Sequence, residues 1–245
     1  MKKKHFIIII FIFAAIMACN KTKQNSDSSK NENTRVSDNI ENGVKDLEAL
    51  NLKGNVKEVR EYSFYDNEVN IEWEKYIEIQ KNSESIIESE IFNYSDTMFF
   101  NMEGKRYSLD LVLIERDELG RIILYDRSTN YMEDINKFTE HYYYSKSGLI
   151  DSIYYVGWEN ESTTSYIYNE QGNPETKYMK YMNESFIGEN TTDYTYISFD
   201  KNGNWTKRIG YTEDKWYDVI EYDEGNYEVN KEITYCVEER EIIYW

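Results

Sequence analysis

Apolar and polar residues alternate with a period of two along much of the chain beyond residue 44, a pattern typical of β-strands. One clear run sets three apolar positions against three polar ones: Trp205, Ile209 and Tyr211 against Thr206, Arg208 and Thr212. Such alternation indicates a sheet with one buried face. The best helical candidate is the short stretch Val44–Leu50, and no convincing longer amphipathic helix is visible.

A four-residue turn that starts with Asp, Asn or Ser and ends with Gly recurs between the strand-like runs. Its copies are Asp117–Gly120, Ser145–Gly148, Asn169–Gly172 and Asp200–Gly203. The first side chain can accept hydrogen bonds from the amides that follow, and the glycine can adopt the positive φ of a type I turn with a bulge. The sequence therefore predicts an all-β domain, built as a single antiparallel meander of consecutive hairpins that form a curved, twisted sheet.

The N-terminus reads as an export signal followed by a tether. Three lysines precede an apolar run, Phe6–Met17, which is too short to span a bilayer and has the length of a signal-peptide core. Ile16-Met17-Ala18-Cys19 resembles a lipobox, although Met17 departs from the family pattern, and this resemblance implies acylation of Cys19. We therefore predict a signal peptide at 1–18, a lipidated cysteine with a disordered, polar tether at 19–43 and one β-domain at 44–245.

The charge and composition of the chain limit the partners and the kinds of site that it can have. Without residues 1–18 the chain keeps 25 basic and 46 acidic side chains, a formal balance of −21, which disfavours nucleic acid and anionic lipid as partners. His141 is then the only histidine, which excludes multi-histidine metal sites, and with Cys19 acylated Cys236 is the only remaining thiol, which excludes an internal disulfide. No cofactor motif is present, and we predict neither a cofactor nor a metal.

The repeated aromatic-Asp/Asn-x-x-Gly hairpin resembles the tyrosine-aspartate (YD, or Rhs-type) repeat. Together with the lipobox, the opening Leu52–Val59 and the closing Asp200–Ile209 resemble small repeat lipoproteins of Bacteroidota, over most of residues 44–245. The resemblance implies a β-sheet fold and an outer-membrane lipoprotein of the cell envelope. Long members enclose toxins, but this chain has too few repeats for a shell.

Two classes of function are compatible with these features. The first is a non-catalytic binding or scaffold module for a glycan or an envelope protein, with contact candidates near the last repeat: Arg208, Tyr211, Trp216 and Tyr217. The second is a carboxylate-based polysaccharide hydrolase, and an immunity protein for a secreted toxin is a third alternative. We favour the non-enzymatic binding module, because nothing in the sequence marks a catalytic pocket. Trp205 is expected to fill the buried face of the sheet instead.

Overall fold

The computed structural model describes residues 45–67, 70–109, 112–127, 129–131, 134–136, 138–218 and 229–245, which belong to one compact unit. The helices are α1 (Lys45–Ala49), α2 (Trp73–Asn82) and α3 (Ile86–Ser89). The strands are β1 (Val56–Asp66), β2 (Tyr94–Phe100), β3 (Arg106–Tyr107), β4 (Leu113–Arg116), β5 (Ile122–Asp126), β6 (Thr129–Tyr131), β7 (Asp134–Asn136), β8 (Thr139–Tyr144), β9 (Ile150–Val156), β10 (Asn160–Tyr168), β11 (Pro174–Asn183), β12 (Phe186–Phe199), β13 (Trp205–Asp218) and β14 (Asn230–Tyr244). The predicted all-β class is confirmed.

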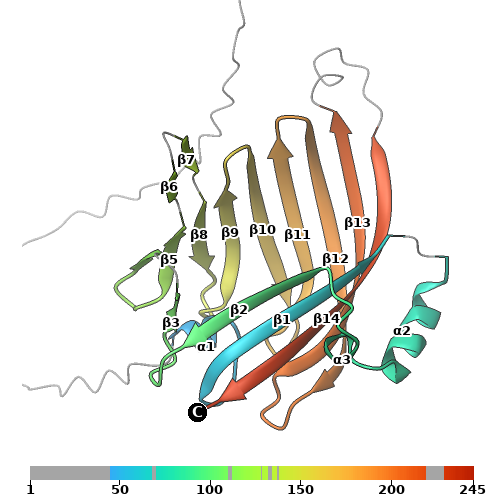
Figure 1. Cartoon of the computed structure of the whole chain (residues 1–245), viewed down its shortest axis with the longest axis horizontal. Coiled ribbons are helices and arrows are strands. Elements are labelled where there is room, and N and C mark those ends of the chain that lie inside the picture. Colours follow the sequence, from blue (N-terminus) through green and yellow to red (C-terminus); the bar gives the residue numbers. More distant parts are fainter. Residues whose placement is uncertain are drawn as a thin grey trace, which may run out of the picture. The chain divides into compact units, whose positions relative to one another are not determined.

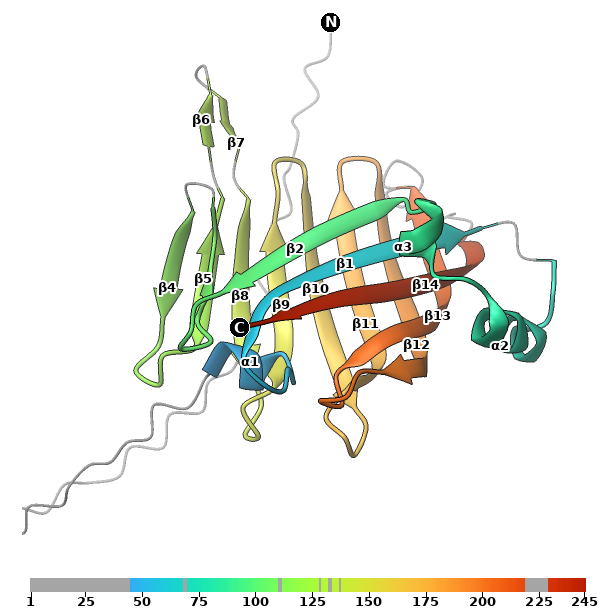
Figure 2. The same cartoon turned by 60° about the horizontal axis from the view of Figure 1, so that its bottom comes forward.

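Twelve of the described strands form one antiparallel sheet, in the order β3-β2-β1-β14-β13-β12-β11-β10-β9-β8-β5-β4. From β8 to β14 consecutive strands are neighbours, as predicted for a meander of hairpins. The first strand, β1, pairs with the last, β14, and β2 and β3 continue the sheet beyond it. The sheet curls strongly without closing, so that β1, β2 and β14 cross in front of β9 to β12 (Figures 1 and 2). β6 and β7 form a separate two-stranded ribbon.

All four predicted turns are confirmed as hairpin turns. In the last one, Gly203 N–H donates to the Asp200 carbonyl at 3.1 Å, Asp200 N–H donates to the Asn204 carbonyl at 2.8 Å, and Gly203 has φ +81°. Asp200 Oδ1 accepts from the amides of Asn202 and Asn204, both at 2.9 Å. The strand register shifts beside every one of the four turns, which is the expected bulge.

A fifth turn of the same kind joins β2 to β3 and was not predicted. Gly104 N–H donates to the Asn101 carbonyl at 2.8 Å, and Gly104 has φ +71°. Asn101 Oδ1 accepts from the amides of Glu103 at 3.0 Å and Lys105 at 2.9 Å. The run Phe99-Phe100-Asn101-Met102-Glu103-Gly104 matches the repeat motif, so the signal was present in the sequence.

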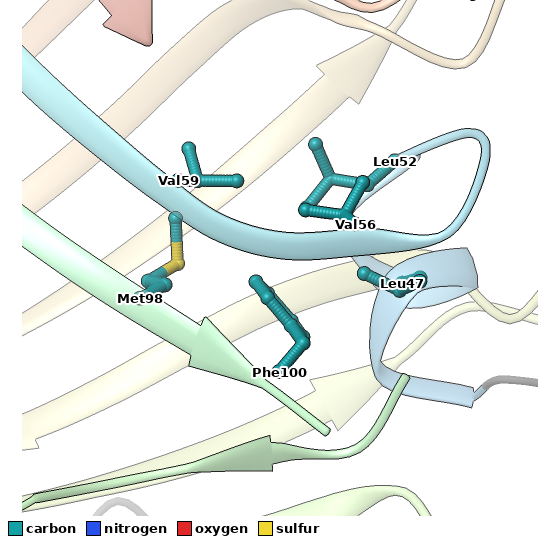
Figure 3. Packing of buried hydrophobic residues seen from close by; sticks show 6 residues of the cluster. All are labelled: Leu47, Leu52, Val56, Val59, Met98 and Phe100. Carbon is teal, nitrogen blue, oxygen red and sulfur yellow. The ribbon is translucent and has the colours of Figure 1, made fainter. Parts of the chain in front are cut away.

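The helix α1 lies across the end of the curled sheet where these turns gather (Figure 2). Leu47 packs in one buried cluster with Val56 and Val59 of β1 and with Met98 and Phe100 of β2 (Figure 3). On another side of the helix, Ala49 packs in a cluster with four residues of the opposite half of the sheet: Ile122, Tyr125, Tyr142 and Ile150. The predicted helix at Val44–Leu50 thus closes one end of the hydrophobic core.

Asp46 of α1 ties the two edges of the sheet together. Its buried carboxylate accepts from the Arg106 backbone N–H at 2.6 Å and from the Arg116 guanidinium at 2.8 Å. Arg106 lies in edge strand β3 and Arg116 in edge strand β4, and Arg116 Nη2 also donates to the Arg106 carbonyl at 3.2 Å. A buried, multiply bonded carboxylate therefore joins edges that do not pair as strands.

The loop after α1 is bonded to two of the repeated turns. Asn51 Nδ2 donates to the Gln171 carbonyl at 3.1 Å and to Asn173 Oδ1 at 2.8 Å. Asn204, which is 2% exposed, accepts from Lys53 N–H at 2.7 Å and donates to the Lys53 carbonyl at 2.9 Å. The N-terminal segment and the repeat turns thus satisfy each other's polar groups.

The helices α2 and α3 correct the expectation that no longer helix follows Val44–Leu50. They follow β1 and precede β2 in the sequence. Tyr76 of α2 packs in a buried cluster with Ile209, Tyr235 and Val237 of β13 and β14. Beneath them, Lys207 and Glu239 form a buried ion pair at 3.3 Å, and Lys207 Nζ donates to Ser83 Oγ at 3.0 Å. This layer covers one face of the two strands and leaves the other face to the inside of the curl.

Candidate functional site

The inner face of the sheet is the candidate functional surface. We define it as the side-chain parity that contains Arg208 on β13 and Glu238 on β14, which is opposite to the parity covered by α2. Lys177 on β11 partly offsets the raised pKa of Tyr65 on β1, although these strands are not neighbours in the sheet. Arg127 beyond β5 acts in the same way on Tyr94 of β2. Arg106 Nη1 of β3 also donates to the Tyr142 hydroxyl of β8 at 3.4 Å, so side chains of distant strands meet across the curl.

Two ion pairs lie at the centre of the inner face. Arg208 Nε donates to Glu238 Oε2 at 2.6 Å, and Arg240 Nε donates to Glu61 Oε1 at 2.5 Å. The Arg208 and Arg240 guanidinium carbons lie 4.3 and 3.6 Å from the centroid of the Trp205 ring. Although burial favours the protonated acid, Arg208 and the other nearby cations hold the pKa of Glu238 below its ordinary value. Glu238 is therefore an ionised partner of Arg208 at neutral pH.

Trp205 is buried at 3% exposure, in line with the expectation that it fills the buried face. Its ring lies against both guanidinium groups, and the ring quadrupole offsets part of the cost of burying them. Tyr194 also packs against Arg208, whose guanidinium carbon lies 3.8 Å from the Tyr194 ring centroid. The centre of the inner face is thus a packed polar layer.

Small residues line the inner face between the aromatic side chains. A Cβ atom at Gly210 would lie 2.6 Å from Cys236 Sγ and 2.9 Å from Thr192 Cγ2, so no larger residue fits there. Burial raises the pKa of the Cys236 thiol to about 12, which leaves it protonated and a poor nucleophile at neutral pH. Cys236 is therefore a small, buried packing residue of β14.

An aromatic platform lies on the same face, away from α1. In the register of the sheet, Gly188 of β12 is directly between Tyr181 of β11 and Trp216 of β13. A Cβ at Gly188 would lie 2.3 Å from Tyr181 Cζ, so the Tyr181 ring rests directly over the glycine backbone. The Tyr181 hydroxyl donates to Asp214 Oδ1 at 2.8 Å, which fixes the ring. Flat rings beside a glycine provide a stacking surface.

The four predicted contact residues do not form one cluster. Arg208 and Trp216 share the inner-face parity, but they are eight residues apart on β13, or about 26 Å along an extended strand. Tyr211 and Tyr217 have the opposite parity, and Tyr211 packs against Trp73 of α2 with ring centroids 5.7 Å apart. Arg208 is engaged with Glu238, so Trp216 is the predicted residue best placed to meet a ligand.

The described residues also show where other chemistry is absent. His141 lies on β8 beside Tyr154, on the parity opposite to the buried Tyr142, and β8 is not a neighbour of the Cys236 strand. Within the described ranges, no cluster of His, Cys, Asp and Glu could hold a metal ion. Over the same ranges, no helix has the length and apolar character needed to cross a membrane.

An exposed groove lies at the tips of two hairpins. It has a volume of about 350 Å³ and is lined by residues of the β9–β10 and β11–β12 connections, among them Trp158, Glu161, Met182 and Glu184. Trp158 is 64% exposed and Met182 is 42% exposed. Trp158, which was not among the predicted contact residues, is more exposed than the half-buried Trp216 and provides a control for the inner face.

Comparison of the chain with models of protein families and with curated proteins finds no match. The resemblance to YD-repeat lipoproteins therefore stays a prediction from the sequence. Cys19 and the tether at 19–43 lie outside the described residues, so lipidation and location also stay predictions.

Proposed function

We propose that this protein is a lipid-anchored, non-catalytic binding module of a bacterial cell envelope, and that its ligand is a glycan bound on the inner face of the sheet. The observation that carries the proposal is the platform of Tyr181, Gly188 and Trp216. Aromatic rings stack on the apolar faces of sugar rings, and the neighbouring tyrosine hydroxyls and carboxylates can bond to sugar hydroxyls. The lipobox-like segment ending at Cys19 supports the anchor and the envelope location.

The inner-face charges favour binding over hydrolysis. A carboxylate-based glycosidase needs one acid with a raised pKa beside a second, ionised carboxylate. Glu238 instead has a lowered pKa and is bonded to Arg208, while Glu61 is bonded to Arg240. Paired in this way, both acids are suited to ordering the site and poorly suited to donating a proton.

A glycan array probed with the purified protein tests the proposal. We expect binding to a limited set of polysaccharides, and we expect Trp216→Ala to weaken binding of the best one by about tenfold or more, with little change in melting temperature. Trp158→Ala is the matched control, since it removes a more exposed tryptophan elsewhere and should leave affinity within about twofold.

Three outcomes would contradict the proposal. Loss of binding in Trp158→Ala but not in Trp216→Ala would move the site to the hairpin tips. Absence of binding to every glycan, with capture of a purified envelope protein, would favour a protein ligand. Release of shorter oligosaccharides by the wild type, abolished by one Asp or Glu substitution, would show a hydrolase.

The anchor is tested separately in cells. The wild-type protein should fractionate with membranes and incorporate a fatty-acid analogue, whereas Cys19→Ala should be unlabelled and soluble after export. A wild-type protein that is exported yet unlabelled would overturn the lipoprotein assignment.

A further inference from the structure

Lys177 is an inner-face cation that lies near the carboxylate of Glu238 without bonding to it. Its neighbours across the strands are Tyr166 on β10 and Thr192 on β12, neither of which is charged. No hydrogen bond, and no ion pair within 4.0 Å, joins its ammonium group to any residue that the structure describes. The nearby Glu238 is already bonded to Arg208 at 2.6 Å. Because its ammonium group is not bonded to a carboxylate, Lys177 is available to bind the anionic group of a ligand.

Besides Glu238, two tyrosine side chains lie near Lys177. Burial raises the pKa of Tyr166, so its hydroxyl stays protonated at neutral pH, and no residue that the structure describes accepts a hydrogen bond from it. Tyr65, which faces Lys177 across the curl, is 43% exposed, so solvent reaches this part of the inner face. One ammonium and one phenol hydroxyl beside an accessible ring are suited to an anionic group.

Cations gather at the centre of the inner face in an otherwise acidic chain. Arg208 and Arg240 are each bonded to a carboxylate, of Glu238 and Glu61, which leaves Lys177 as the cation without a bonded carboxylate. The formal charge of the chain is −18, but exposed charges farther away than about 8 Å are largely screened at physiological ionic strength. A direct contact with Lys177 therefore outweighs the distant acidic surface.

We propose that Lys177 and the Tyr166 hydroxyl bind an anionic substituent of the glycan, so that the ligand is an acidic saccharide. This inference rests on the proposed function. Tyr181 and Lys177 share the inner-face parity of β11 and are four residues apart, about 13 Å along the strand. A saccharide stacked on the Tyr181–Trp216 platform can thus extend along β11 to place an acidic group at Lys177.

The matched pair Lys177→Met and Lys180→Met tests this assignment. Lys180 lies on the same strand but on the outer parity and is exposed, so both variants lose one charge from β11 and only one loses it from the inner face. Binding of oligogalacturonate, a sulfated oligosaccharide and a phosphorylated oligosaccharide is measured by titration calorimetry. The neutral methyl ester of oligogalacturonate is the ligand control.

We expect at least one acidic probe to bind the wild type, and Lys177→Met to weaken its binding by about 10- to 100-fold. Lys180→Met should change affinity less than about twofold, and the methyl ester should bind wild type and Lys177→Met alike. The probe that responds identifies the anionic group as carboxylate, sulfate or phosphate.

Binding of neutral glycans only, or equal effects of the two lysine variants, would overturn this inference and leave the proposed function standing. Failure of every glycan, acidic or neutral, to bind the wild type would overturn both. Thermal unfolding of Lys177→Met serves as the folding check, and its melting temperature should match that of the wild type because Lys177 has no bonded partner to lose.

Discussion

Truncation of Asn204 should destabilise the whole domain, because this one side chain joins three parts of the chain. It accepts from Lys53 N–H at 2.7 Å, donates to the Lys53 carbonyl at 2.9 Å and donates to the Tyr244 hydroxyl at 2.8 Å. At about 1 kcal/mol net for each hydrogen bond, and somewhat more where a buried partner is left unsatisfied, Asn204→Ala should cost about 2–4 kcal/mol.

Urea unfolding followed by far-UV circular dichroism measures this cost. The midpoint should fall in Asn204→Ala while the slope stays unchanged, which separates lost stability from a change in the unfolded state. Lys201→Ala is the control, since Lys201 is exposed in the same turn and should cost less than about 0.5 kcal/mol. Equal midpoints for the two variants would refute the view that Asn204 fastens the N-terminal segment to the last repeat.

Three further outcomes are expected. Gly120→Val should cost about 1–3 kcal/mol in urea unfolding from its φ of +80° alone, since no atom lies within 4 Å of an added Cβ, and a cost equal to that of Glu118→Ala would contradict this. Cys236 should resist a thiol reagent at pH 8 until urea unfolds the protein, because burial raises its pKa to about 12; rapid labelling of the native protein would refute the assignment. Because the pKa of Glu238 in the folded protein is below its ordinary value of 4.5, its ionised form stabilises the fold at pH values above 4.5, and this stabilisation is lost as the pH falls through the pKa of the folded state. The free energy of unfolding, measured from pH 6 to pH 3, should therefore fall less steeply in Glu238→Gln than in the wild type.

Local chemistry made the hairpins predictable. The conformation of the turn from Asp200 to Gly203 is determined locally, because the acceptor side chain and the positive-φ glycine lie within the same four residues. The Asn101–Gly104 turn follows the same rule, so its residues alone were sufficient to predict it. The helix α2 was missed for a different reason: charged residues interrupt its apolar face, and tertiary packing of Tyr76 compensates for a weak helical pattern.

The site was harder to predict because proximity in sequence differs from proximity on a sheet face. Trp216 and Tyr217 are adjacent in sequence, yet alternation sends them to opposite faces. Tyr181 and Trp216 are far apart in sequence and become neighbours through the register of β12. The pairing of Arg240 with Glu61 likewise depends on β1 joining β14, which no local pattern indicates.

The pairing of β1 with β14 also governs the order in which the domain can fold. The strands β1, β2 and β3 precede the others in the chain, yet among the described strands their only strand pairing with the rest of the sheet is with β14, which follows all the others. Closing so long a loop is entropically costly, and folds dominated by such distant contacts form slowly. Until β14 is synthesised, the hairpins from β8 to β13 can assemble in succession. The free edge of β1 stays unpaired during this time and can pair with other chains, which leads to aggregation. A nascent chain that stalls before residue 230 would therefore contain most of a sheet and three strands that lack their partner strand β14.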